Sequence, residues 1–134
     1  MNRDLSVLRV LYVEDNPADA ELARRVLARA APWIELKVAT TIAEVKAALQ
    51  RAELPDVLAT DLHLPDGSGI ELVSWLRTCG LALPVVVLTA ADNHRSALTA
   101  LRAGADDYVT KHGDYLQRLP RILRAARERK LRRK

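Results

Sequence analysis

The sequence lacks the features that mark secreted, membrane-spanning and multidomain chains. A single cysteine, Cys79, excludes an intramolecular disulfide. No stretch resembles a signal peptide, and no apolar run reaches the ~18 residues that a membrane-spanning helix requires. Repeats, low-complexity segments and internal linkers are also missing. We therefore expect one soluble, cytoplasmic domain. At 134 residues, 49% of them hydrophobic, the chain is long enough to bury a core.

The net charge of +4 hides an uneven distribution. Residues 118–134 hold nine Lys or Arg and one acid, Glu128, whereas the other 117 residues hold 12 basic and 16 acidic side chains. The tail is thus strongly basic and the body mildly acidic. Nucleic-acid binding is one hypothesis from this pattern, although a terminal basic helix is more typical of a solvated, linking or partner-binding segment.

Apolar and alternating runs predict five strands, at residues 8–14, 34–40, 56–60, 84–90 and 107–110. Helical periodicity predicts five helices, over residues 17–29, 41–50, from the Ser68 cap to residue 80, through residues 97–104, and from about residue 116 to the end. Local signals for the helix starts are Asn16 before Pro17 and two capping boxes, Thr41 with Glu44 and Ser68 with Glu71.

Strands that alternate with helices imply an α/β fold, because each parallel crossover needs a connection the size of a helix. The expected architecture is a single parallel sheet covered by helices on both faces. In such sheets the ligand binds beyond the carboxyl ends of the strands. Polar residues at those ends are therefore candidates for a site.

Polar side chains follow four of the five predicted strands. They are Glu14 and Asp15 at the end of the first strand, Asp61 at the end of the third, Thr89 at the end of the fourth and Lys111 after the fifth. Three carboxylates at one sheet edge would repel one another unless a cation held them, and solvated loop acids would not explain such alignment. Oxygen ligands without His or Cys select a hard ion, and few protein ligands with room for water favour Mg²⁺.

Asp61 lies where an apolar strand leaves the core, a position that aspartate rarely occupies without a partner or a function. Mg²⁺ commonly binds a phosphate, and the Lys111 ammonium and Thr89 hydroxyl can neutralise phosphoryl oxygens. We expect the Asp61 carboxylate to be a nucleophile that forms an aspartyl phosphate. A haloacid-dehalogenase-type phosphatase is the rival enzyme hypothesis, but it would need a second aspartate at the position of His63.

The sequence resembles the response regulator receiver domain, the CheY-like phosphoacceptor module of two-component signalling. Four motifs carry the resemblance: "VEDN", "DLHLPDGSG", "LTA" and "DDYVTK", each at a predicted strand end. The resemblance covers nearly the whole chain. It implies the flavodoxin-like strand order 2-1-3-4-5, a receiver domain over residues 1–126 and a basic extension of the last helix over residues 127–134.

By the same resemblance each candidate residue has a role. Glu14 and Asp15 are the acidic Mg²⁺ pair, Asp61 is the phosphorylated residue and a metal ligand, and the backbone carbonyl of His63 is a further ligand. Thr89 and Tyr108 form the switch pair, and Lys111 binds the phosphate. For Tyr108 the alternative is a strand aromatic with its hydroxyl in water. His63 and Ala91 flank the site and could influence hydrolysis, although an ordinary exposed His63 is an equal alternative.

One position departs from the family pattern. The family usually has proline after the lysine, in a cis peptide bond, whereas here His112 and Gly113 follow Lys111. A cis bond before His112 would cost about 2.5–4 kcal/mol, so we expect a trans loop in which Gly113 supplies the flexibility.

Other residues have less specific interpretations. His63, His94 and His112 lack the spacing of a zinc site. We expect Cys79 to be a small buried side chain and Asp66 to be a turn residue, whereas Trp33 and Trp75 could cover core edges or mark a contact face.

The tail bears on the partners. Beyond Arg127 only Leu131 is apolar, so we expect the last turns to project from the domain, and Pro120 could mark the true helix start. The resemblance implies a histidine kinase or phosphotransfer protein as phosphodonor. It also implies an effector domain or protein target, and leaves open a dimer through the face of the fourth helix, fifth strand and fifth helix. Alternative functions are a pseudo-receiver docking module, which is not phosphorylated, and nucleic-acid binding through the tail.

Overall fold

The computed structural model describes residues 7–51, 54–90 and 94–132. Its strands are β1 (Leu8–Val13), β2 (Ile34–Ala39), β3 (Val57–Asp61), β4 (His63–Leu64), β5 (Gly67–Ser68), β6 (Val85–Thr89) and β7 (Asp107–Thr110). Its helices are α1 (Pro17–Ala30), α2 (Ile42–Arg51), α3 (Gly69–Thr78), α4 (His94–Ala103) and α5 (Tyr115–Arg132). In the described part of the chain, no helix is long and apolar enough to span a membrane.

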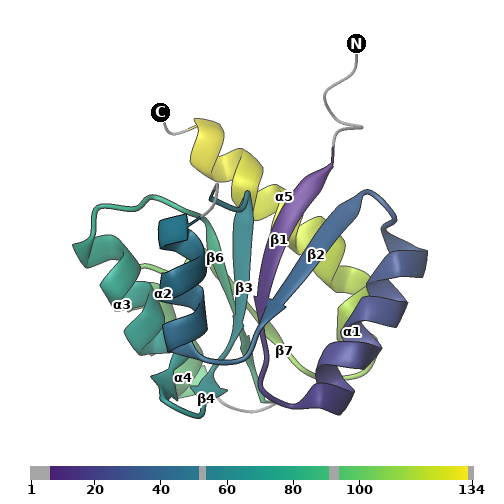
Figure 1. Cartoon of the computed structure of the whole chain (residues 1–134), viewed down its shortest axis with the longest axis horizontal. Helices are drawn as coiled ribbons and strands as arrows, with labels where there is room; N and C mark the ends of the chain where they lie inside the picture. Colours follow the sequence, from purple (N-terminus) through teal and green to yellow (C-terminus); the bar gives the residue numbers. More distant parts are fainter. Residues whose placement is uncertain (1–6, 52–53, 91–93, 133–134) are drawn as a thin grey trace.

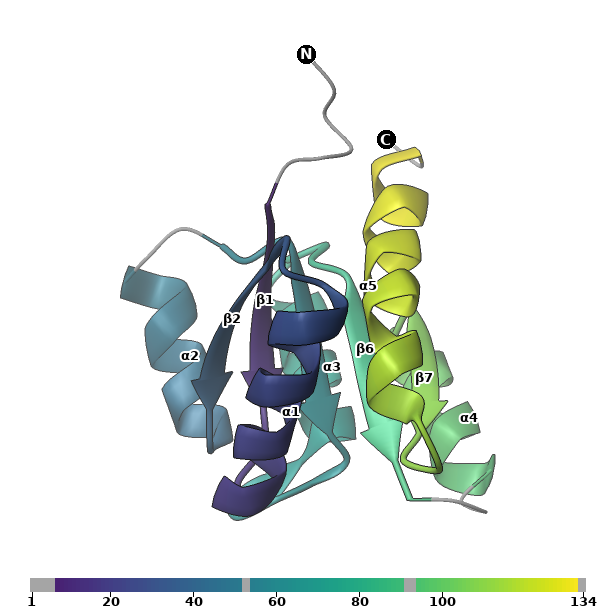
Figure 2. The same cartoon turned by 90° about the vertical axis from the view of Figure 1, so that its right-hand side faces the viewer.

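Five strands form one parallel sheet in the order β2-β1-β3-β6-β7. Helices α1 and α5 cover one face, and α2, α3 and α4 cover the other (Figures 1 and 2). The predicted doubly wound α/β fold and its 2-1-3-4-5 order are therefore confirmed. The hairpin of β4 and β5 was not predicted, because its two-residue strands lie within a run of turn residues.

The core consists of two apolar layers separated by the sheet. Alternate residues of a strand point to opposite faces, so Tyr12 packs under α1 and α5 while Leu11 and Val13 pack under α2 and α3. The central strands β3 and β6 are buried on both faces, which explains why their sequences are almost continuously apolar.

Two helix starts follow the predicted capping. The Asn16 side chain accepts hydrogen bonds from the backbone N–H groups of Ala18 and Asp19, at 2.9 and 3.2 Å. Both halves of the Ser68 and Glu71 capping box are present at α3. These contacts satisfy N–H groups that have no partner inside the helix.

The capping of α2 differs from the prediction. The Thr41 hydroxyl accepts from the Glu44 N–H at 3.0 Å, but the Glu44 carboxylate accepts from Thr40 instead of Thr41. Asp66, expected to be only a turn residue, caps the same helix, because its carboxylate accepts from the N–H groups of Ile42 and Ala43 at 2.9 and 3.1 Å. The β4–β5 segment is thereby tied to α2.

Three further expectations were wrong or were left undecided by the sequence. Cys79 is exposed rather than buried, because it follows the last turn of α3. Pro120 lies inside α5 rather than at its start, and it is buried there. Trp33 and Trp75 are half-buried beneath cations, with Arg124 4.1 Å and Lys46 4.8 Å from the respective ring centres.

The last turns of α5 extend past the ends of the strands (Figure 2), but they are tied to the domain by ion pairs at least through Lys130. Acidic residues before and at the starts of β3 and β7 hold them. The ion pairs are Arg127–Asp56 at 3.3 Å, Arg129–Asp107 at 3.8 Å and Lys130–Asp106 at 2.9 Å. The predicted boundary at residue 127 stays a prediction, and residues 133–134 of the basic extension lie outside the described residues.

Candidate functional site

The polar residues predicted at the strand ends meet at one edge of the sheet. Glu14 and Asp15 directly follow β1, Asp61 ends β3, Thr89 ends β6 and Lys111 directly follows β7. The register brings these ends together, since Asp61 pairs with Leu88 and Thr89 pairs with Thr110 in neighbouring strands.

The Lys111 ammonium joins the buried Glu14 carboxylate to the partly buried Asp61 carboxylate. Its Nζ atom lies 2.7 Å from Oδ1 of Asp61 and 2.8 Å from Oε1 of Glu14. The backbone N–H of Lys111 donates to the Thr89 carbonyl at 2.7 Å, which fixes where the side chain begins. No cis peptide bond occurs in the described residues, and Gly113 has φ +60°, in agreement with the expected trans loop.

Burial and charge oppose each other at Asp61. The pKa of Asp61 is raised from its ordinary value of 3.8 to about 6. Burial is the largest cause, the hydrogen bond and charge of Lys111 oppose it, and neighbouring Glu14 adds to it. Burial alone would lower the pKa of Lys111, but its hydrogen bonds to both carboxylates outweigh burial and raise it. Lys111 therefore stays protonated at neutral pH.

Three carboxylates at this edge fit a hard divalent cation. Glu14, Asp15 and Asp61 each offer an oxygen, and these oxygens lie within 4.8 Å of one another. Glu14 is only 1% exposed and accepts a hydrogen bond from the Asn16 N–H at 3.2 Å, whereas Asp15 is exposed. The all-oxygen donor set suits Mg²⁺. His63 has an exposed side chain, and the role of its carbonyl stays a prediction.

The Thr89 hydroxyl is buried at the same edge. The residue is 1% exposed, and the hydroxyl has no hydrogen-bond partner among the described residues. Tyr108 lies in β7 next to Val87 of β6, and it is partly buried against the layer under α2, α3 and α4. Buried hydroxyls rarely lack partners, so the Thr89 hydroxyl is available to a group that enters the site. Ala91 lies outside the described residues.

Sequence reasoning missed a glycine that the site requires. A Cβ atom at Gly69 would lie 2.6 Å from the Asp61 carbonyl oxygen and 3.2 Å from Cγ2 of Thr60. The start of α3 therefore packs directly against the backbone of Asp61. The glycine-rich run after Asp61 was the available signal.

A second buried hydroxyl was also missed. Tyr12 is 0% exposed, and its hydroxyl interacts with that of Tyr115. Burial raises the pKa of Tyr12, and nearby Tyr115, Glu14 and Asp61 raise it further. The phenol therefore stays neutral behind the carboxylates.

Comparisons with known proteins agree with this geometry. A family model described as the response regulator receiver domain matches residues 10–123. The transcriptional regulatory protein TrcR of Mycobacterium tuberculosis is 38% identical over 108 residues, which cover 81% of this chain and 41% of TrcR. The response regulator protein PilR of Pseudomonas aeruginosa is 34% identical over 122 residues, which cover 91% of this chain and 26% of PilR.

Solved structures give the same result. A two-component response regulator of the LuxR family from an Aurantimonas species is 31% identical, with a TM-score of 0.78 over 90% of this chain and 86% of that chain. The phosphorylated cyanobacterial phytochrome response regulator RcpA is 27% identical, with a TM-score of 0.73 over 94% of this chain and 95% of that chain.

The chain spans less than half the length of the curated relatives described above. The family model's match, residues 10–123, includes the sheet edge that carries the acids. The chain belongs to the response regulator receiver domain family, the phosphoacceptor switch module of two-component signalling.

Proposed function

We propose that Asp61 accepts the phosphoryl group of this receiver domain and that Lys111 and Thr89 bind that group. The observation that carries the proposal is the position of the Lys111 ammonium, 2.7 Å from the Asp61 carboxylate and 2.8 Å from Glu14 at the carboxyl edge of the sheet. A cation held between two carboxylates can turn to the oxygens of a phosphoryl group once Asp61 carries one.

The reaction is a transfer of a phosphoryl group to a carboxylate. An oxygen of Asp61 attacks phosphorus, a P–O bond forms, and the bond from phosphorus to the donor breaks: P–N in a phosphohistidine or P–O in an acyl phosphate. Lys111 and the Thr89 hydroxyl offset the charge on the phosphoryl oxygens. Mg²⁺, held by Glu14, Asp15, Asp61 and the carbonyl of His63, would supply further positive charge at those oxygens.

The buried Thr89 hydroxyl supports a switch that involves Tyr108. A phosphoryl oxygen at Asp61 would offer the partner that this hydroxyl lacks among the described residues. Movement of Thr89 toward that oxygen would leave space for the neighbouring Tyr108 ring to turn inward. This change would alter the face formed by α4, β7 and α5.

The partners follow from the family. The phosphodonor is a histidine kinase or a phosphotransfer protein, and the output goes to an effector domain or protein target, or through a dimer of the α4, β7 and α5 face. TrcR, named a transcriptional regulatory protein, is much longer than the matched region and is compatible with such an effector. No catalytic enzyme family is indicated, so the domain acts as a signalling module in the cytoplasm that catalyses its own transfer and hydrolysis.

The alternatives are less well supported. The comparisons do not favour the pseudo-receiver docking module, and its only support is His112 in place of proline. Nucleic-acid binding through the tail is weakened because Arg127, Arg129 and Lys130 already pair with acids.

Acetyl phosphate tests the proposal. After incubation with Mg²⁺, the intact mass should rise by one phosphoryl group, and the gain should be absent in Asp61→Asn and without Mg²⁺. If neither acetyl phosphate nor beryllium fluoride modifies or binds the protein, the docking-module interpretation is the better one.

A further inference from the structure

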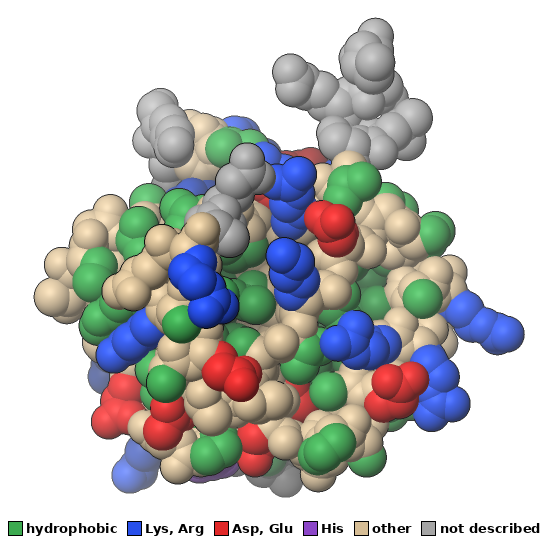
Figure 3. Space-filling view, viewed as in Figure 1, with side chains coloured by type: hydrophobic (Ala, Val, Ile, Leu, Met, Phe, Trp, Pro, Cys, Tyr) green, Lys and Arg blue, Asp and Glu red, His purple; other side chains and the backbone are tan. Residues whose placement is uncertain are grey.

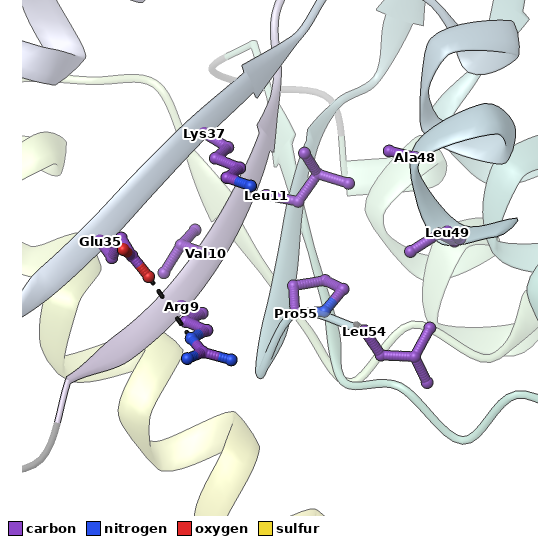
Figure 4. A pocket seen from close by; sticks show the side chains of 9 residues that line it. All are labelled: Arg9, Val10, Leu11, Glu35, Lys37, Ala48, Leu49, Leu54 and Pro55. Atoms are coloured by element: carbon purple, nitrogen blue, oxygen red, sulfur yellow. Dashed lines mark ion pairs between the residues drawn. The ribbon is translucent and has the colours of Figure 1, made fainter. Parts of the chain in front are cut away.

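A hollow of about 380 Å³ lies between α2 and the first halves of β1 and β2, away from the phosphoacceptor edge (Figure 4). Its walls are mainly apolar, and they include Leu11, Ala48, Leu49, Leu54 and Pro55. Leu54 is 45% exposed, so part of this apolar wall is open to solvent. The volume lies within the range of about 300–1,000 Å³ that small-molecule sites occupy.

The alternation of β2 explains why the hollow stays open. Ile34, Leu36 and Val38 pack toward the α1 and α5 side, so Glu35 and Lys37 point to the α2 side. Elsewhere that side of the sheet is covered by apolar helix residues. Here charged residues occupy the sheet, and the small side chain of Ala48 on α2 leaves the space unfilled.

The charges around the hollow favour an anion. Arg9 and Glu35 offset each other, since Nε of Arg9 lies 3.4 Å from Oε1 of Glu35. Lys37 forms no ion pair with any described residue, and Figure 4 shows its ammonium end beside Leu11, over the apolar wall. Lys and Arg side chains also gather over the middle of this face, around apolar side chains (Figure 3).

We propose that this hollow binds a small carboxylate that has an apolar chain. The apolar walls would hold the chain, and Lys37 would pair with the carboxylate. A neutral apolar molecule would gain nothing from the Lys37 charge, and an inorganic anion would leave the apolar walls in contact with water. The ligand is a free molecule in solution, because a hollow with walls on both sides fits one chain better than a membrane surface.

Decanoate, below the concentration at which it forms micelles, is a suitable probe for the ¹⁵N-labelled full chain. Decanol supplies the apolar chain without the charge, and acetate supplies the charge without the chain. Decanoate should shift the amide resonances of Leu11, Lys37, Ala48 and Leu49 in a saturable way. Decanol should bind more weakly than decanoate, and acetate should shift none of these signals.

Variants of two residues test the two halves of the proposal. Lys37→Gln should weaken the binding of decanoate by about two- to fivefold, the range expected for loss of an exposed ion pair. The affinity for decanol should not change. Ala48→Glu should abolish binding of both, because it places a charged chain in the hollow. Ala47→Glu, the same change one residue earlier on α2, should still bind both decanoate and decanol. The circular dichroism spectra of all three variants should match that of the wild type.

Several results would overturn the proposal. These are no saturable shift with decanoate, unchanged decanoate affinity in Ala48→Glu, and decanol affinity equal to that of decanoate. Co-sedimentation with phosphatidylglycerol vesicles that Ala48→Glu abolishes would assign the face to a membrane instead. None of these results depends on Asp61, so they leave the phosphoacceptor proposal untouched.

Discussion

Replacement of Lys111 by glutamine tests how the acidic site is held together. In the wild type one ammonium lies within 2.8 Å of oxygens from both Glu14 and Asp61. Glutamine keeps most of the side-chain volume but removes the positive charge. The Glu14 carboxylate, only 1% exposed, would then have lost the ammonium beside it.

The size of the effect follows from burial. Loss of one partner from a fully buried ion pair costs about 3–5 kcal/mol. The Lys111 and Asp61 side chains are 19% and 17% exposed, so water can compensate in part. We expect Lys111→Gln to lower the free energy of unfolding by roughly 2–3 kcal/mol without divalent cations. Added Mg²⁺ should restore more stability to the variant than to wild type, because it takes over the role of the missing charge.

Urea unfolding followed by circular dichroism, in EDTA and in Mg²⁺, measures both effects. Lys46→Gln is the matched control. Lys46 lies on α2, contacts Trp75 of α3 and is outside the acidic site. Equal stability of wild type and Lys111→Gln in EDTA would refute the idea that this ammonium holds the carboxylates. Equal stabilisation of both by Mg²⁺ would show that Lys111 and the ion do not share one site.

Three other changes have specific outcomes. Thr89→Val should raise the melting temperature, because a buried unpaired hydroxyl costs about 1–3 kcal/mol, yet it should abolish the NMR shift of Tyr108 on beryllium fluoride binding. Gly69→Ala should cost about 1–3 kcal/mol by overpacking and slow acetyl phosphate transfer, whereas Gly80→Ala, where a Cβ meets nothing within 4 Å, should cost roughly 1–2 kcal/mol and leave transfer unchanged. Asp66→Asn should lower the melting temperature at neutral pH. Hydrogen bonds from the α2 N-terminus lower the pKa of Asp66, so this stabilisation is full above its ordinary pKa near 3.8 and is lost as the pH falls through the lowered folded-state pKa.

A specific result would contradict each of these three predictions. If the Tyr108 resonance still shifts when beryllium fluoride binds to Thr89→Val, Thr89 and Tyr108 do not act as a switch pair. Normal transfer in Gly69→Ala would show that the Asp61 backbone tolerates a displaced α3. A melting difference for Asp66→Asn that persists unchanged at acid pH would remove the charge of Asp66 from the explanation.

Periodicity and the strand-end rule were sufficient for the α/β class and for the residues at the sheet edge, whereas the strand order was predicted from the family resemblance. The apolar strands and capped helices alternate regularly, so topology alone brings Glu14, Asp61 and Lys111 to one edge. These predictions depend on local patterns, and such patterns survive folding when each helix and strand agrees with the global arrangement.

Long-range contacts explain what the sequence did not reveal. Asp66 caps a helix that begins 24 residues earlier, and Gly69 is needed because a carbonyl from a different element approaches it. The end of α5 is held by Asp56, Asp106 and Asp107, which lie far from it in sequence. A reading of local composition predicted a free basic helix because it could not detect those partners.

The most direct test of the central claim locates the phosphorylated residue. Borohydride reduces an aspartyl phosphate to homoserine, which peptide mass spectrometry assigns to one position. After treatment with acetyl phosphate and Mg²⁺, homoserine should occur at position 61 and at no other aspartate. Homoserine at position 15 or 66, or a phosphorylated protein that yields no homoserine at all, would contradict the assignment of Asp61 as the phosphoacceptor.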